Sequence, residues 1–481
     1  MEADTVSFIL PAANDWKALA PEILLTLSGT LLIVLGAFLR RRPRVVNCLA
    51  VSIFFLNMMY VFMFESYFYK SGFNGMLNVP TYTWFLFFCG FLSSVMGARW
   101  LSKSPAPHAG EFYGILAITV AALSVFTRSM HLMLTFVALE ASAICFYVLI
   151  AWARKQPQNL GSSIRYLILS GASGAFFLLG IAFIYGAGLK NGIDFLYYYN
   201  FFEAINSKLF YAGLIFVLSG IFFKLSAFPF QFWAPDVYQG APTPITAFMA
   251  VASKAAAFTV LYSMLRFTML DSRMIFGLAL VAAAGIIIGN LGGLVEKNTK
   301  RLLGFSGIAN AGYMMVLMVS ILSASATGFI DDRHAISAIK FYLFAYLLGV
   351  YGVMFVQNLH TSENDSKLEL ADFNGLWKKS PLSTGVLATG LASLAGIPPT
   401  AGFFAKVLVL ILAIASGFHW LAILLVVGSA ASIYYYFRWM RAPFADNAAT
   451  QFEPSEASGP IMLAITFGSV VMGIFVFAYL F

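Results

Sequence analysis

The sequence has little charge. Asp, Glu, Lys and Arg make up only 10% of the 481 residues, whereas hydrophobic residues make up 60% and the mean hydropathy is +0.83. Soluble domains use about 25% charged and about 45–50% apolar residues, so this composition excludes an ordinary soluble enzyme. The 49 Phe, 22 Tyr and 8 Trp are typical of a chain in contact with acyl chains and lipid headgroups. We therefore expect the lipid bilayer to be the solvent of this protein.

Motifs for cofactors, metals and nucleotides are also missing. The three cysteines, Cys48, Cys89 and Cys145, lie inside apolar runs without the CxxC or Cys/His spacing of a metal, haem or cluster site. The sequence has no GxGxxG after a strand, no P-loop and no nucleophile elbow. The net charge of +8 is spread over short loops, which argues against nucleic-acid binding. We expect no cofactor and no metal on this chain, and any driving energy must come from an ion gradient or from partner subunits.

Apolar runs of about 20 residues recur along the whole chain, and each can cross the roughly 30 Å hydrocarbon core as a helix. We count about fourteen, with no connection large enough to form a soluble domain. The predicted spans begin near Leu19, Val45, Tyr82, Phe112, Met130, Ile164, Leu209, Pro244, Ile275, Arg301, Ala335, Leu382, Trp420 and Ile461. The prediction is an all-α membrane protein with one polytopic domain over residues 1–481.

Lys and Arg residues are more frequent in alternate loops. Cytoplasmic loops of membrane proteins carry such an excess. Seventeen lie on one predicted side, including the run Arg40 to Arg44 and the pair Arg154 and Lys155, and eight, including Lys70 and Arg128, lie on the other. The sequence therefore predicts that both termini are on the non-cytoplasmic side.

Two predicted spans contain proline breaks, in FKLSAFPFQFWAPDVYQGAPTP (223–244) and in LASLAGIPPTAGFFAK (391–406). Proline removes a backbone donor and clashes with the preceding turn, so each helix should be interrupted and should leave free backbone groups at membrane depth. Interrupted segments at matching places in two halves indicate inverted repeats. We place two repeats of five helices at 111–268 and 272–441, with helices 1–3 in 1–110, broken helices 7 and 12, and the last helix in 458–481.

Buried charges are the main functional candidates, because a Lys at the centre of a span costs roughly 2.5–3.5 kcal/mol. Lys224, Lys254, Lys340 and Lys406 fall inside predicted spans, and Glu140 in LTFVALEASAICF is the carboxylate that lies well inside an apolar run. Burial and a nearby carboxylate shift the proton affinity of a lysine in opposite directions, which suits proton carriage. We expect Lys224 to pair with Glu140, with a static salt bridge as the alternative. Lys254 and Lys406 are further relay candidates, and Lys340 is interpreted as a membrane anchor.

Four other residues are weaker candidates. Arg165 and Lys300 begin their spans at the cytoplasmic side, where they act either as anchors or in proton uptake. Asp236 in APDVYQGAP either recruits protons or caps the next helix. Asn310 in GFSGIANAGY either binds water or serves polar packing.

Three strings, FKLSAFPFQFWAPDVYQGAPTPITAF, NTKRLLGFSGIANAGYM and LASLAGIPPTAGFFAK, resemble the subunit N family of bacterial complex I, the proton-pumping NADH:quinone oxidoreductase. The resemblance covers nearly the whole chain, and PDVYQGAP is its most specific part. It implies the Mrp antiporter-like fold of fourteen helices with broken helices 7 and 12. It further implies that Glu140 pairs with Lys224, that Lys254 is the central relay, and that Lys406 is the proton-transfer lysine of the second half.

The resemblance also implies partners. FMN, iron–sulfur clusters and quinone would be bound by other subunits, and neighbouring antiporter-like and small membrane subunits would surround this chain in the bacterial inner membrane. Arg165 and Asn310 depart from a related subunit that has lysine and histidine there, and an arginine does not readily release its proton. A subunit of an Mrp-type cation/proton antiporter is the alternative function, and a scaffold of the membrane arm is a third.

Overall fold

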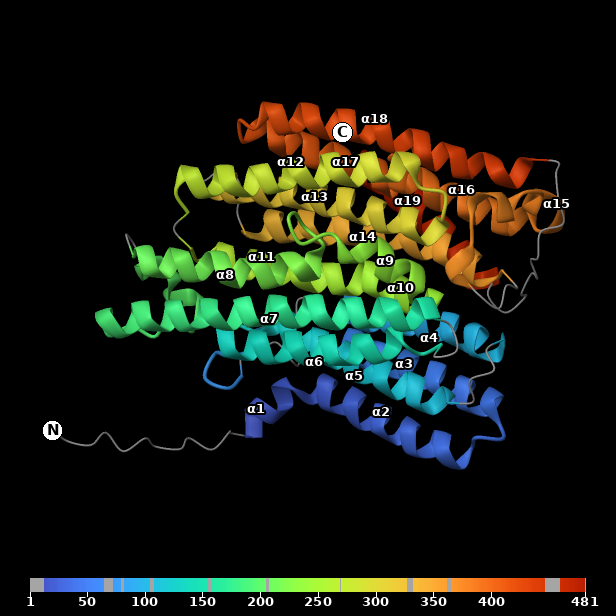
Figure 1. Ribbon diagram of the computed structural model, residues 1–481, viewed down its shortest axis with the longest axis horizontal. Coiled ribbons are helices and arrows are strands. Elements are labelled where there is room, and N and C mark those ends of the chain that lie inside the picture. Colours follow the sequence, from blue (N-terminus) through green and yellow to red (C-terminus); the bar gives the residue numbers. More distant parts are fainter. Residues whose placement is uncertain are drawn as a thin grey trace.

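The computed structural model describes residues 13–64, 72–78, 82–103, 108–153, 157–204, 207–268, 270–326, 332–360, 365–445 and 459–480. Apart from four isolated bridges, the regular structure in these ranges is helical. Most helices run along the long axis of the molecule, side by side in one bundle (Figure 1). Lys70, Arg154 and Lys155, which contributed to the orientation prediction, lie outside the described residues.

The helices fall into long ones, of 12 residues or more, and short ones, of 8 residues or fewer. The long helices are α2 (Ala20–Phe38), α3 (Pro43–Phe64), α4 (Thr83–Lys103), α5 (Ala109–Arg128), α6 (Leu132–Ile150), α7 (Pro157–Asn191), α8 (Lys208–Leu225), α11 (Lys254–Leu265), α12 (Ser272–Val295), α13 (Thr299–Ala326), α14 (Asp332–Asn358), α16 (Pro381–Ala395), α17 (Ala401–Ala415), α18 (His419–Arg441) and α19 (Gly459–Leu480). The short ones are α1 (Ala13–Ala18), η2 (Tyr198–Glu203), α9 (Trp233–Gly240), α10 (Thr243–Phe248), the π-helix η3 (Met249–Ser253), η4 (Asp365–Lys367), η5 (Leu370–Phe373), α15 (Leu376–Lys379) and η6 (Ala442–Phe444).

Within the described ranges, twelve helical stretches are long and apolar enough to cross a membrane, and α10, η3 and α11 together form one of them. The shorter apolar pair α16 and α17 supplies a further crossing, and α19 supplies another. The prediction of about fourteen spans in an all-α membrane protein is confirmed.

Burial shows which spans are central. In the most apolar part of the span Thr243–Leu265 every residue is buried. In the most apolar part of α2, only 28% of the residues are buried. Large apolar side chains such as Leu27, Leu56 and Ile423 are more than 60% exposed, as expected of side chains that face lipid. Figure 1 agrees, because α2 and α18 lie at opposite edges and α10 and α11 lie between them. The span that carries Lys254 is therefore the core of the bundle.

Both predicted helix breaks are present. α8 ends at Leu225 and is followed by Ser226 in the left-handed region, with φ of 58°. α16 ends at Ala395 and is followed by Gly396, with φ of 83°. A Cβ on Gly396 would lie 2.9 Å from the side chain of Lys406, so glycine meets both the backbone and the packing requirement. The repeat boundaries at 111–268 and 272–441 stay a prediction.

Candidate functional site

Lys224 lies in the last turn of α8, directly before the first break, and its side chain is 1% exposed. Its Nζ donates to Ser142 Oγ of α6 at 2.8 Å and to Tyr166 Oη of α7 at 3.3 Å. The Nζ also lies 4.9 Å from the ring centre of Phe146. The ammonium is therefore held by neutral groups, two hydroxyls and an aromatic face.

Glu140 lies two residues before Ser142 on α6. No salt bridge within 4.0 Å joins it to Lys224, although the two groups lie close enough to interact electrostatically. Its Oε1 is buried without a hydrogen-bond partner among the described residues. It faces Gly174 of α7, where an added Cβ would lie only 2.2 Å from Oε1. Glu140 and Lys224 thus lie near each other without direct contact.

Lys254 is the first residue of α11 and is completely buried. Its Nζ donates to the main-chain oxygen of Gly307 on α13. The π-helix η3 ends at the residue before it, and π-turns inside membrane helices are frequent at functional sites. Lys254 therefore connects the core span to the second half of the chain.

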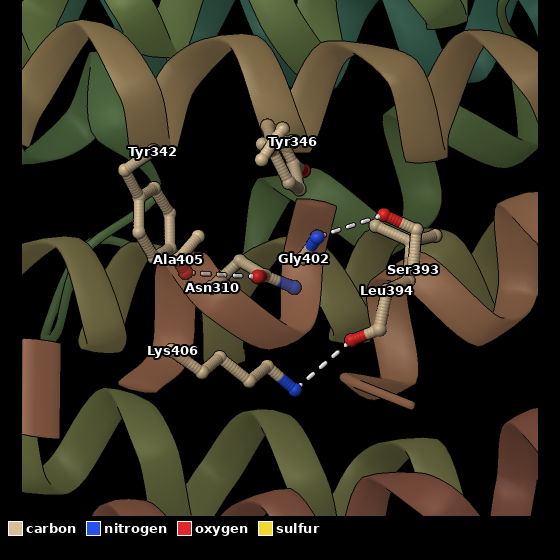
Figure 2. Close-up of a pocket in the computed structure, with 9 residues that line it drawn as sticks. Asn310, Tyr342, Tyr346, Ser393, Leu394, Gly402, Ala405 and Lys406 are labelled. Carbon is tan, nitrogen blue, oxygen red and sulfur yellow. Dashed lines mark hydrogen bonds between the residues drawn. The ribbon is translucent and has the colours of Figure 1, made fainter. Parts of the chain in front are cut away.

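Lys406 lies in the second turn of α17, after the second break, and is 7% exposed. Its Nζ donates to the main-chain oxygen of Leu394 at 3.0 Å (Figure 2). It also donates to the main-chain oxygen of Ala395 at 2.9 Å. These oxygens end α16, where the break removes their helical partners and where the helix dipole favours a cation. Nζ also lies 5.1 Å from the ring centre of Tyr313.

A cavity of about 10 Å³ lies beside Lys406. That volume is close to the smallest that holds one water molecule. Its polar lining comes from α13, α14, α16 and α17: Asn310, Tyr342, Tyr346, Ser393 and Lys406. Tyr342 Oη donates to Asn310 Oδ1 at 3.1 Å, the hydrogen bond drawn between these two residues in Figure 2. Asn310 and Lys406 are therefore brought together at a site sized for water.

Asp236 lies at the start of α9 and accepts hydrogen bonds from Arg165 of α7 and Arg301 of α13. Arg301 also pairs with Glu296 at 2.9 Å. The Asp236 carboxylate therefore holds a helix of the first half against a helix of the second. Arg165 has a side chain that is 63% exposed, and it lies in this clamp rather than beside a buried lysine.

Lys300 is completely buried and forms an ion pair with Asp365 at 2.9 Å. It also donates to the main-chain oxygen of Ala241 at 2.8 Å. Asp365 accepts in addition from the main-chain nitrogen of Thr243 at 2.9 Å and from its hydroxyl at 2.6 Å. The segment after α14 thus folds back over the start of α10. Sequence reasoning missed Asp365, because it lies in a polar connection with no apolar neighbours that would indicate burial.

A second buried ion pair was also missed. Glu22 of α2 and Arg128 of α5 are 3% and 1% exposed, and Arg128 Nη1 contacts both carboxylate oxygens at 2.8 and 3.0 Å. The sequence analysis counted Arg128 only among the basic residues of the non-cytoplasmic loops. The available signal was Glu22, a carboxylate one turn into the first span. No group of three His, Cys, Asp or Glu side chains suited to a metal ion occurs in the described part of the chain.

A family of known proteins and individual relatives both match this sequence. The family described as "NADH:quinone oxidoreductase/Mrp antiporter, TM" matches residues 129–432. The chain is 35% identical to NADH-quinone oxidoreductase subunit N 1 of Opitutus terrae over 93% of this chain and 90% of that protein.

Solved structures show the same fold. A chain of respiratory complex I from Thermus thermophilus with bound aureothin superposes with a TM-score of 0.78 at 28% identity, over 95% of this chain and 97% of that one. A chain of the Mrp complex from Dietzia sp. gives the same TM-score over 96% of both chains, but its 16% identity is evidence of a shared fold only. The chain therefore belongs to the NADH:quinone oxidoreductase/Mrp antiporter family of multi-pass membrane proteins, alongside the relatives named subunit N.

Proposed function

We propose that this chain is a proton-translocating, antiporter-like subunit N of a bacterial NADH:quinone oxidoreductase. Protons would move through Glu140, Lys224, Lys254 and Lys406 while electrons pass from NADH to quinone in other subunits. One observation carries the proposal: Lys224, Lys254 and Lys406 are buried and, among the described residues, donate only to neutral oxygens.

The contrast with Lys300 supports this interpretation. Lys300 is equally buried but pairs with Asp365 at 2.9 Å, so its charge is compensated. An ammonium buried without a carboxylate in direct contact is costly, and the neutral amine therefore competes with it. Small changes in the surrounding dipoles then load or unload a proton. Lys300 suits a structural role, and the other three suit proton carriage.

The helix breaks are the places where the dipoles around Lys224 and Lys406 can change. Lys406 holds the freed carbonyls of Leu394 and Ala395, and Lys224 ends the helix before the other break. Broken helices in transporters place backbone dipoles at membrane depth around an ion site. A shift of either break would change the acceptors available to its lysine, and with them its affinity for a proton.

The energy would come from partner subunits. FMN, iron–sulfur clusters and quinone are assigned to those partners, and neighbouring antiporter-like and small membrane subunits are the expected contacts. This assignment rests on the relatives named NADH-quinone oxidoreductase subunit N. The bias of Lys and Arg between loops supports an inner-membrane orientation with both termini on the non-cytoplasmic side.

An Mrp-type cation/proton antiporter subunit is the competing function, because the matched family includes both types of protein. Purification of the tagged chain from its native membrane in a mild detergent separates the two. The proposal predicts co-purification with flavin- and iron–sulfur-containing subunits and with NADH:quinone reductase activity. A complex without these subunits that exchanges Na⁺ for H⁺ would support the antiporter instead.

A scaffold role is tested by replacing Lys224 with Ala in the assembled complex. The proposal predicts fewer protons pumped per quinone reduced. A fully assembled variant with the wild-type ratio would support the scaffold.

A further inference from the structure

We propose that Tyr346 of α14 passes the proton between Lys254 and Lys406, and that Gly307 of α13 keeps open the gap in which Lys254 and Tyr346 meet. The inference rests on the proposed function and adds two residues to it. Tyr346 would be a relay residue, and Gly307 a positioning residue.

Gly307 of α13 leaves a gap beside Lys254 and Tyr346. A Cβ on Gly307 would lie 2.7 Å from Lys254 Nζ and 3.5 Å from Tyr346 Oη. The ammonium and the hydroxyl therefore border the same small space, which any side chain at position 307 would fill. Lys254 also reaches across this point to donate to the main-chain oxygen of Gly307. The absence of a side chain at Gly307 thus leaves the space between the two polar groups open.

Tyr346 also borders the cavity of about 10 Å³ beside Lys406. Tyr346 and Lys406 both line it (Figure 2). This volume suits one water molecule, and in the proposed path that water links the Tyr346 hydroxyl to the lysine. Tyr346 is the residue that borders both the Gly307 gap and this cavity.

The other polar groups around the cavity are less suited to this role. The Tyr342 hydroxyl donates to Asn310 Oδ1, and the Asn310 amide nitrogen donates to the main-chain oxygen of Ser306 at 2.9 Å. Tyr346 is 5% exposed, and no hydrogen bond from its hydroxyl to another described residue is present. Its hydroxyl can therefore use both its donor and its acceptor capacity on the path.

The proton balance needs no tyrosinate. Lys254 in its ammonium form gives one proton to the oxygen of Tyr346, while Tyr346 gives its own hydroxyl proton to the water in the cavity. The water passes a proton to the neutral amine of Lys406. One N–H bond is lost at Lys254 and one is gained at Lys406, and Tyr346 and the water return to their starting forms when their O–H bonds reorient.

The test uses the whole complex, purified and reconstituted in lipid vesicles, with protons pumped per quinone reduced as the readout. Tyr346→Phe removes the hydroxyl and keeps the ring. Gly307→Ala keeps the hydroxyl but puts a methyl group into the gap, and the nearest atom is the movable end of Lys254. Both variants should assemble and should lower the ratio as far as Lys406→Gln does.

Matched control variants test whether a change in packing alone lowers the ratio of protons pumped per quinone reduced. Gly90→Ala of α4 is similarly crowded, since its Cβ would lie 2.8 Å from Val120 Cγ2, but it lies in an apolar contact. Tyr351→Phe removes a buried hydroxyl that is hydrogen-bonded to Ser93 at 2.8 Å, outside the proposed path. Both should keep the wild-type ratio. Gly307→Ser fills the gap but adds a hydroxyl, so it should retain more pumping than Gly307→Ala, a difference that crowding alone would not produce.

The outcomes are distinguishable. If Lys406→Gln lowers the ratio while Tyr346→Phe and Gly307→Ala do not, this inference is wrong and the proposed function stands. If Lys406→Gln also leaves the ratio unchanged, the proposed function fails and the inference fails with it. If Tyr346→Phe does not assemble, the comparison of Gly307→Ser with Gly307→Ala decides the question, because both keep every hydroxyl of the path and equal ratios in the two would overturn the inference.

Discussion

The ammonium of Lys406 on α17 donates a hydrogen bond to the main-chain oxygen of Leu394 on α16, at 3.0 Å across the helix break. The first break is arranged differently. There, the indole nitrogen of Trp233 donates to the main-chain oxygen of Phe223 at 2.9 Å, and Lys224 turns to side-chain hydroxyls instead. The second break therefore uses its lysine both to satisfy the helix end and to line a cavity sized for water.

Lys406→Gln should separate these two roles. The amide keeps a donor for the carbonyls of α16 but cannot carry a proton, so the complex should assemble and pump fewer protons per quinone reduced. Lys406→Ala should also lose stability, by about 1–3 kcal/mol for each buried acceptor left unpaired. Thermal unfolding of the detergent-solubilised complex, with pumping measured in vesicles, checks both. Normal pumping by Lys406→Gln would contradict the assignment.

Glu140→Gln should reduce pumping with little effect on assembly. The carboxylate makes no salt bridge within 4.0 Å, so its replacement breaks no direct ion pair, but it removes the negative charge that acts on Lys224. Proton uptake by vesicles during quinone reduction measures the effect. The exposed Glu203→Gln is the control and should behave as wild type. Equal pumping by both variants would remove Glu140 from the path.

Arg128→Ala should be strongly destabilising. It leaves the Glu22 carboxylate buried without its partner, and breaking a buried pair in this way costs about 3–5 kcal/mol. The expected result is a clear loss of assembled complex in native gels, together with a lower unfolding temperature. Lys208→Ala, at an exposed helix start, should change stability by less than about 0.5 kcal/mol. An Arg128→Ala complex as stable as wild type would show that the pair contributes nothing.

His131 should make the stability depend on pH. Burial between α5 and α6 lowers the pKa of His131 below its usual value near 6.5, and the opposing effect of Asp194 is smaller. His131 of the unfolded chain therefore binds a proton at a higher pH than His131 of the folded chain does. The contribution of His131 to the stability of the fold is lost as the pH falls below about 6.5.

Unfolding temperatures of wild type and His131→Gln between pH 5 and 8 measure this contribution. The difference between the two proteins should shrink as the pH falls. A difference that does not change with pH would exclude the effect.

Much of the fold could be predicted from the sequence, because lipid imposes a simple rule: apolar runs of about 20 residues become spans. The run from Pro244 was recognised in this way, and the break at Pro398 and Pro399 was recognised from the prolines themselves. The π-helix before Lys254 could not be predicted, since a shift of one hydrogen bond leaves no pattern in the side chains.

The site was predictable only in part. Lysines in apolar runs stand out by their cost, so Lys224, Lys254 and Lys406 were found. Their acceptors were not found, because a main-chain oxygen such as that of Gly307 or Leu394 has no sequence signature. Asp365 and Arg128 were missed because tertiary folding, rather than the neighbouring residues, buries them.

The central claim is that the buried lysines conduct protons as one row. It is tested most directly by the number of protons pumped per quinone reduced by the purified complex with Lys254→Met, in which the side chain keeps its approximate length and loses its ability to bind a proton. The account predicts a lower ratio than in wild type at normal assembly and with intact electron transfer from NADH. A fully assembled Lys254→Met complex that pumps at the wild-type ratio would contradict it.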